Sequence, residues 1–131
     1  MKKTTFIFTL LFSIITFVSP SYGEWEFVIK NQAGSNFYLE TDKIRKHDGN
    51  IFVWELADFL KPDSLGNLSA GTYIQLDCKL LRFKYLSFAF YKQPMGNGTP
   101  EVSKPIKQLQ GWQYSPPNTT QEYIKKFICN I

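Results

Sequence analysis

"KHDGNIFVWELADF", residues 46–59, joins a tight-turn pattern to a strand pattern. Asp48-Gly49 favours a type I′ turn, because both central positions of that turn need a positive φ. The aromatic and β-branched residues that follow predict a strand over residues 51–60. We expect Trp54, within this strand, to pack in the core or between elements.

Two carboxylates in this strand invite a catalytic interpretation. Glu55 and Asp58 are residue types that a glycosidase uses as a pair, and Asp42 with Asp48 is the other pair in the region. Glu55 and Asp58 are three positions apart, so on a strand they point to opposite faces and do not converge. We therefore expect them to be solvated residues on the strand and at its end.

Two short strands are expected before the turn. "EWEFVIK", residues 24–30, alternates Trp25 and Phe27 with polar neighbours, which is typical of a strand. "NQAGSN" then supplies a turn, and "NFYLE", residues 36–40, forms the second strand. Residues 41–44 are too few for more than a corner or a single helical turn.

A loop and a long alternating segment are expected after residue 60. Residues 61–71 are rich in Pro, Gly, Ser and Asn, which predicts a loop. Residues 72–82 then alternate, with the inward side formed by Ile74, Leu76, Cys78 and Leu80. The alternation changes phase at Leu81, and a second apolar stretch continues to residue 93. A bulge near Leu81 explains this slip, and so does a tight turn near Arg82.

The C-terminal part is expected to contain an irregular loop, a strand and a helix. Residues 94–107 hold three Pro and two Gly without periodicity, and residues 108–115 predict a last strand. Asn118 has Gln121 three positions later, which is a capping-box arrangement ahead of a helix that reaches Cys129. Four apolar residues share one side of this helix: Tyr123, Ile124, Phe127 and Ile128. Lys125 and Lys126 lie near its C-terminal end, where the helix dipole favours cations.

Together these elements predict an α+β fold, a single antiparallel sheet of about five or six strands with the C-terminal helix packed on one face. Cys78 and Cys129 are the only cysteines. In an exported chain this even count predicts a disulfide that ties helix to sheet. Closing a loop of about 50 residues would stabilise the fold by roughly 3 to 4 kcal/mol. A reactive thiol, the alternative, would need a basic partner.

Residues 1–23 have the order of a secretory signal. Lys2 and Lys3 precede an apolar run over residues 6–18, and Ser21 and Gly23 occupy the −3 and −1 positions of a cleavage site. The run is shorter than the roughly 20 residues of a spanning helix, so cleavage is expected, with an uncleaved anchor as the alternative. No cysteine lies near the site for a lipid anchor. We expect an exported domain, residues 24–131, without a membrane span, in the periplasm, on the cell surface or secreted.

Charge and residue types argue against several classes of function. Cleavage of the signal sequence removes Lys2 and Lys3, which leaves 13 of the 15 basic residues against 11 acidic ones. The net charge therefore falls from +4 to +2, and no nucleic-acid partner is expected. The single histidine, His47, adjoins a turn, which disfavours a catalytic triad. With both cysteines paired, too few ligands remain for zinc, and no Gly-rich phosphate loop occurs. We therefore expect a protein that is not an enzyme and that binds no cofactor or metal. A catalytic function is kept as the third option, after the two functions given below.

A basic and aromatic segment is the candidate binding surface. Arg82, Lys84 and Lys92 interleave with aromatic residues, and Met95 and Asn97 lie in the irregular loop that follows. Such loops often carry binding residues. A sheet with one wet face explains the interleaving equally well. As a binding surface it would suit a polyanionic glycan or an acidic patch of a protein.

The sequence resembles the bacterial surface-adhesin protein E family over nearly all of residues 24–131. The resemblance is carried by "EWEFV", "FYLETDKI", "DGNIFVWELADF", "QLDCKLLRFKYLSFAFY", "GWQYSPP" and a final helix ending in "FIC". Its scaffold residues here are Trp54, Asp77 next to Cys78, Trp112 and Cys129. The resemblance implies an antiparallel sheet with a disulfide-linked C-terminal helix, a homodimer, and binding to host matrix and plasma proteins such as vitronectin, laminin and plasminogen.

Two functions from different classes follow. The first is an exported non-enzymatic binding protein that resembles adhesins for host extracellular-matrix or plasma proteins. The alternative is a periplasmic structural or accessory protein with an unknown partner and no host-binding role. Cell fractionation separates them, because recovery from the periplasm alone favours the second.

The disulfide provides a direct test of the predicted fold. When the unreduced, unfolded protein is treated with a thiol alkylating agent, its intact mass should stay unchanged, because both sulfur atoms are already bonded. Mass spectrometry before and after reduction checks this. Labelling of Cys78 and Cys129 without a reductant would contradict the pairing.

Overall fold

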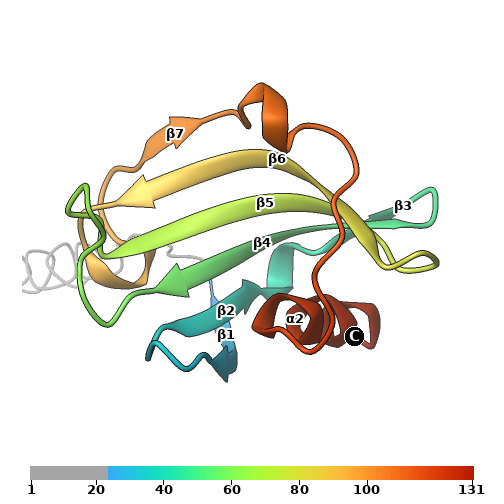
Figure 1. The fold of residues 1–131 in the computed structure, drawn as a ribbon, viewed down its shortest axis with the longest axis horizontal. Coiled ribbons are helices and arrows are strands. Elements are labelled where there is room, and N and C mark those ends of the chain that lie inside the picture. The colour runs from blue at the N-terminus through green and yellow to red at the C-terminus, as the bar shows by residue number, and fades with distance from the viewer. Residues whose placement is uncertain (1–23) are drawn as a thin grey trace, which may run out of the picture.

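The computed structural model describes residues 24–131, so the expected signal sequence lies outside the described residues. They form one antiparallel sheet with one α-helix on a face (Figure 1), which confirms the predicted α+β fold. The strands are β1 (Trp25–Lys30), β2 (Asn36–Glu40), β3 (Arg45–His47), β4 (Asn50–Asp58), β5 (Ser69–Asp77), β6 (Arg82–Tyr91) and β7 (Glu101–Ser103). The helices are the 3-10 turns η2 (Thr41–Lys43), η3 (Pro94–Gly96) and η4 (Lys107–Leu109) and the α-helix α2 (Thr120–Cys129).

The sheet has the order β1-β2-β4-β5-β6-β7, and β3 pairs with the first part of β4. The predicted turn between β3 and β4 is confirmed, because Asp48 and Gly49 have φ values of 50° and 78°. β2 pairs with the second part of β4, so β2 and β3 share one side of that strand, with η2 as the corner between them.

A tight turn joins β5 to β6, which decides between the two expectations for Leu81. β5 ends at Asp77, which pairs with Arg82, and Leu81 between them has a φ of 50°. Oδ1 of Asp77 accepts a hydrogen bond from the backbone N–H of Lys79 at 3.0 Å. The prediction that Leu80 faces inward is wrong, because this turn leaves the side chain 55% exposed.

The region before α2 differs from its prediction. Residues 108–115 form no strand: they contain the end of η4, a Gly111 with a φ of 83°, and only one bridge, between Gln113 and Phe83. The positive φ interrupts the extended backbone that a strand needs. The irregular loop also contains the short strand β7, which pairs with β6.

The start of α2 also differs from the predicted capping box. The N-cap is Thr119 instead of Asn118, because Asn118 has a φ of 62°. Thr119 Oγ1 accepts a hydrogen bond from the N–H of Glu122 at 3.2 Å, and Glu122 Oε1 accepts one from the N–H of Asn118 at 3.1 Å. Tyr123, expected on the inward side, is 50% exposed.

The core lies between the sheet and α2. Strand alternation turns Ile51 and Val53 of β4, and their partners on β5, toward the helix. Ile124 and Ile128 of α2 meet them. The buried members are Leu39, Ile51, Val53, Ile74, Leu76, Phe83, Ile124 and Ile128.

A buried ion pair connects α2 to the same sheet face. Lys125 is 1% exposed, and its Nζ lies 3.1 Å from both carboxylate oxygens of Glu55. The same Nζ donates to Oε1 of Gln121 at 2.7 Å and lies 4.4 Å from the centre of the Phe83 ring. The prediction that Glu55 is solvated is therefore wrong: Glu55 follows Ile51 and Val53 in the alternation and is 7% exposed.

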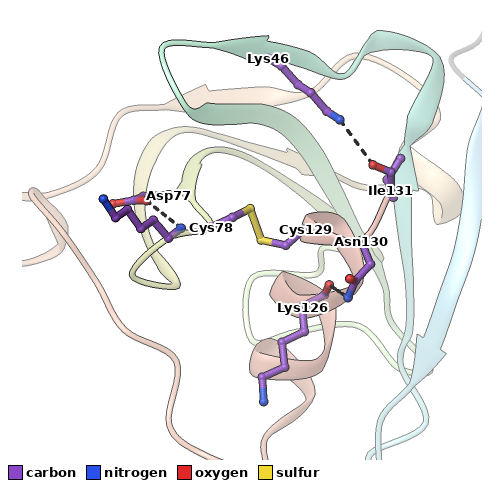
Figure 2. The surroundings of a disulfide bond; sticks show 8 residues. Lys46, Asp77, Cys78, Lys126, Cys129, Asn130 and Ile131 are labelled. Carbon is purple, nitrogen blue, oxygen red and sulfur yellow. Dashed lines mark hydrogen bonds between the residues drawn. A yellow bond between two sulfur atoms is a disulfide. The ribbon is translucent and has the colours of Figure 1, made fainter.

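The disulfide fixes the C-terminal end of α2. Cys78, in the turn after β5, is bonded to Cys129 in the last turn of the helix, with their Cα atoms 5.7 Å apart (Figure 2). Lys46 of β3 donates from Nζ to the backbone oxygen of Ile131 at 3.4 Å. The predicted pairing of the cysteines is confirmed, and the helix is attached to the sheet at its middle, through Lys125, and at its C-terminal end, through Cys129.

We expect the ion pair to be strongly coupled in a double-mutant cycle. Replacing only one partner, with Glu55→Leu or Lys125→Met, leaves a buried charge uncompensated and should lower the free energy of unfolding by about 3 to 5 kcal/mol. The double variant should lose much less than the sum of the two. Urea unfolding followed by tryptophan fluorescence measures all four proteins.

A second ion pair on the same helix supplies the control. Lys126 and Glu122 are 3.4 Å apart, with the lysine side chain 59% exposed. The cycle of Glu122→Leu and Lys126→Met should show a coupling of only about 0.3 to 0.5 kcal/mol. Additive effects at Glu55 and Lys125 would contradict the account of helix attachment.

Candidate functional site

The sheet face opposite α2, here called the outer face, is covered by no α-helix of the described residues (Figure 1). The alternation that sends Ile51 and Val53 to the helix sends Phe52 and Trp54 to this face. Trp54 packs across the strands on Tyr73, with ring centres 5.1 Å apart, and is only partly buried. The outer face is therefore aromatic and accessible, and Trp54 lies on it instead of under the helix.

Arg82, Lys84 and Trp112 form a basic platform at one end of the outer face. The guanidinium of Arg82 lies 4.1 Å from the centre of the Trp112 ring, and Nζ of Lys84 lies 4.6 Å from it. The bridge between Gln113 and Phe83 places this tryptophan: both residues exchange backbone hydrogen bonds of 3.0 and 2.7 Å, so the residue before Gln113 projects to the outer face.

The two cations of the basic platform are not equivalent. Arg82 donates from Nε to Oδ2 of Asp77 at 3.0 Å, and this hydrogen bond is the largest effect that lowers the pKa of Asp77 and raises that of Arg82. Within residues 24–131, no carboxylate lies within ion-pair distance of Lys84. Arg82 is thus partly neutralised, while Lys84 keeps its charge for a ligand.

A pocket of about 390 Å³, here called the outer pocket, opens at the other end of the outer face. Three aromatic residues and one carboxylate contribute to its wall. The principal lining residues are Trp25, Glu40, Trp54, Tyr91, Met95 and Asn97. Met95 and Asn97, two of the sequence-predicted binding residues, therefore come together here.

The turn η3 forms one wall of the outer pocket and is held by hydrogen bonds. The N–H of Met95 donates to Oδ1 of Asp58 at 2.7 Å, and the N–H of Gly96 donates to Oγ of Ser69 at 2.9 Å. Ser69 in turn donates to the backbone oxygen of Gln93 at 2.7 Å. Asp58, expected to be a solvated residue, is instead an acceptor that positions this turn.

Lys92, the remaining predicted binding residue, lies apart from both sites. Its Nζ donates to the backbone oxygen of Leu65 at 2.6 Å, so it braces the loop between β4 and β5. The five predicted residues therefore divide among the basic platform, the outer pocket and this loop contact. Sequence reasoning missed Glu40 and the stacking of Trp112, because neither follows from spacing along the chain.

The described residues offer little for covalent or metal chemistry. His47 and Asp48 are 3.1 Å apart at the exposed tip of the β3–β4 hairpin, and Glu55 and Asp58 occupy opposite faces of β4. In residues 24–131, no group of three or more His, Cys, Asp or Glu side chains could hold a metal ion. None of the described helices is long and apolar enough to cross a membrane.

Comparison with known proteins identifies the relatives of this fold. The structure resembles crystal form II of Haemophilus influenzae protein E, with a TM-score of 0.60, 18% identity, and coverage of 86% of this chain and 91% of that chain. It also resembles protein E from non-typeable Haemophilus influenzae, with a TM-score of 0.57, 18% identity, and coverage of 86% and 79%. At these identities the likeness shows the fold. A comparison with curated protein sequences gives no match.

The family follows from the sequence. Residues 25–130 match the profile described as surface-adhesin protein E, which spans all of the sheet and α2. This chain belongs to the surface-adhesin protein E family.

Proposed function

We propose that this chain is an exported, non-enzymatic protein that binds host extracellular-matrix or plasma proteins through its outer face. Membership of a surface-adhesin family supports a binding role. The observation that carries the proposal is the basic platform: Arg82 and Lys84 are held beside Trp112 on the face that α2 leaves uncovered. Its chemistry is suited to recognition and supplies no nucleophile.

The basic platform favours an acidic segment of a protein or a polyanionic glycan. Lys84 offers a charge with no carboxylate within ion-pair distance, and the guanidinium of Arg82, which already donates to Asp77, has further N–H groups that can donate to a second anionic group. Trp112 supplies a rigid aromatic surface of the kind that dominates many protein interfaces. With a net charge of only +2 on residues 24–131, attraction to an anion depends on this local cluster and weakens as salt increases.

The proposal places the protein at the cell surface, one of the locations in which the outer face can meet host proteins. Antibody labelling of an epitope-tagged copy on intact cells tests it. The expected result is labelling without permeabilisation. Labelling only after the outer envelope is opened would instead favour a periplasmic accessory protein.

We expect binding to depend on Lys84 and Trp112. The protein is passed over immobilised vitronectin, laminin, plasminogen and heparin in a biosensor at increasing salt. For any surface that binds saturably, Lys84→Glu and Trp112→Ala should each weaken the affinity by about tenfold or more, because they reverse a contact charge or remove an aromatic anchor.

A charge-matched variant provides the control. Lys61 is exposed in the loop between β4 and β5, away from the basic platform, and Lys61→Glu changes the net charge by the same amount. Its affinity should change by less than about twofold. Equal losses for the Lys61 and Lys84 variants, or no saturable binding to any of the four surfaces, would contradict the proposal.

A further inference from the structure

We propose that the outer pocket is a second binding site, which takes the ammonium group of a lysine side chain presented by a protein partner. Its chemistry is opposite to that of the basic platform, because a carboxylate and not a cation lies among the aromatic rings. Trp25, Trp54 and Tyr91 supply the rings, and Glu40 supplies the charge. The site takes a charge opposite to that of the ligand assigned to the basic platform, and its assignment to a protein partner rests on the proposed function.

The aromatic wall is suited to a cation. Aromatic faces attract ammonium groups, and the attraction increases where the cation is removed from water. Gly71 leaves the floor of the pocket free: a Cβ atom at this position would lie 3.4 Å from Cε3 and Cζ3 of Trp54. The indole of Trp54 therefore lies against the bare backbone of β5, and Trp54 also lines the pocket.

Glu40 is a buried charge with a weak partner. The residue is 7% exposed, whereas the side chain of Lys43, whose Nζ lies 3.2 Å from Glu40 Oε1, is 66% exposed. Among residues 24–131, no other group donates a hydrogen bond or ion pair to this carboxylate. An ammonium group inside the pocket would form a second ion pair with Glu40, which would be less exposed to solvent than the one with Lys43 and therefore stronger.

The pKa of the Tyr91 phenol is affected by burial and by the negative charge of Glu40. Burial is the main cause that raises the pKa of Tyr91, and the negative charge of Glu40 raises it further. The tyrosine is thus a neutral ring near a carboxylate. Neutral rings around a single negative charge favour a cation and disfavour an anion.

The pocket is preformed. Three hydrogen bonds from Met95, Gly96 and Ser69 hold η3 in place, so little ordering is needed when a ligand enters. The pocket opens on the same sheet face as the basic platform. A polypeptide lying across the outer face can therefore reach both sites, which is the reason to assign the cation to a protein side chain.

The three tryptophans of the chain allow a specific test. In a ¹H–¹⁵N spectrum of the exported protein, Nα-acetyl-L-lysine methylamide should shift the indole signals of Trp25 and Trp54 and leave that of Trp112 unchanged. Nα-acetyl-L-norleucine methylamide, which has the same apolar stem without the charge, should produce no such shift. Choline at the same concentrations is the third probe, and it should bind no more tightly than the lysine probe.

Variants change the affinity in opposite directions. Glu40→Gln keeps the shape of the side chain and removes its charge, and should weaken lysine-probe binding by about tenfold. Lys43→Gln removes the competing cation and should strengthen binding by about threefold. Glu26→Gln, at an exposed carboxylate of β1, is the matched control and should change nothing. A purely structural role for Glu40 would not produce the gain with Lys43→Gln.

Several outcomes would overturn the proposal. They are equal binding of the norleucine probe, binding of choline without binding of the lysine probe, shifts at Trp112 alone, and no shifts at any indole. If Glu40→Gln proves to be unfolded in its thermal denaturation curve, Lys43→Gln decides alone: unchanged or weaker affinity would reject the lysine site.

Discussion

Lys125 reaches from α2 to Glu55 in the middle of β4, and this buried contact holds the helix on the sheet face that also carries Ile51 and Val53. An ammonium group removed from water requires a carboxylate and further acceptors, which Glu55 and Gln121 provide. The disulfide between Cys78 and Cys129 fixes the C-terminal end of the helix, one turn beyond Lys125. Helix and sheet therefore have one mutual arrangement.

In that arrangement the two faces of the sheet have different roles. The face under α2 contains the core, so it supplies stability. The outer face keeps two unlike sites: the basic platform around Trp112, and the outer pocket with Glu40 among aromatic rings. Because both sites rest on strands that the opposite face holds rigid, their side chains are preorganised for a ligand.

Local patterns predicted much of the fold. Asp48-Gly49 predicted the β3–β4 hairpin, because a type I′ turn needs residues that adopt a positive φ. The disulfide was predictable because two cysteines in an exported chain allow only one pairing. The sequence did not predict a strand end at Asp77, although the phase change at Leu81 marked it. A last strand was also predicted where only one bridge forms, at Gln113. A single bridge leaves no periodic pattern in the sequence from which it could be predicted.

The two charged residues at the centre of the structure were missed for a physical reason. Glu55 shares the alternation of Ile51 and Val53, yet a carboxylate is ordinarily assigned to solvent unless its partner is known. Lys125 is 70 residues away in sequence, and no spacing connects them. The binding surface was difficult for the same reason, because its members meet only through strand pairing. Arg82 and Met95 lie near opposite ends of the outer face.

Hydroxyl-radical footprinting with and without vitronectin tests most directly whether the outer face is the binding face. The account predicts that oxidation decreases at Tyr73 and Trp112 on this face. Tyr123, which is half-exposed on α2, should react equally in both states. Protection of Tyr123 with unchanged Trp112, or no protection anywhere, would contradict the assignment.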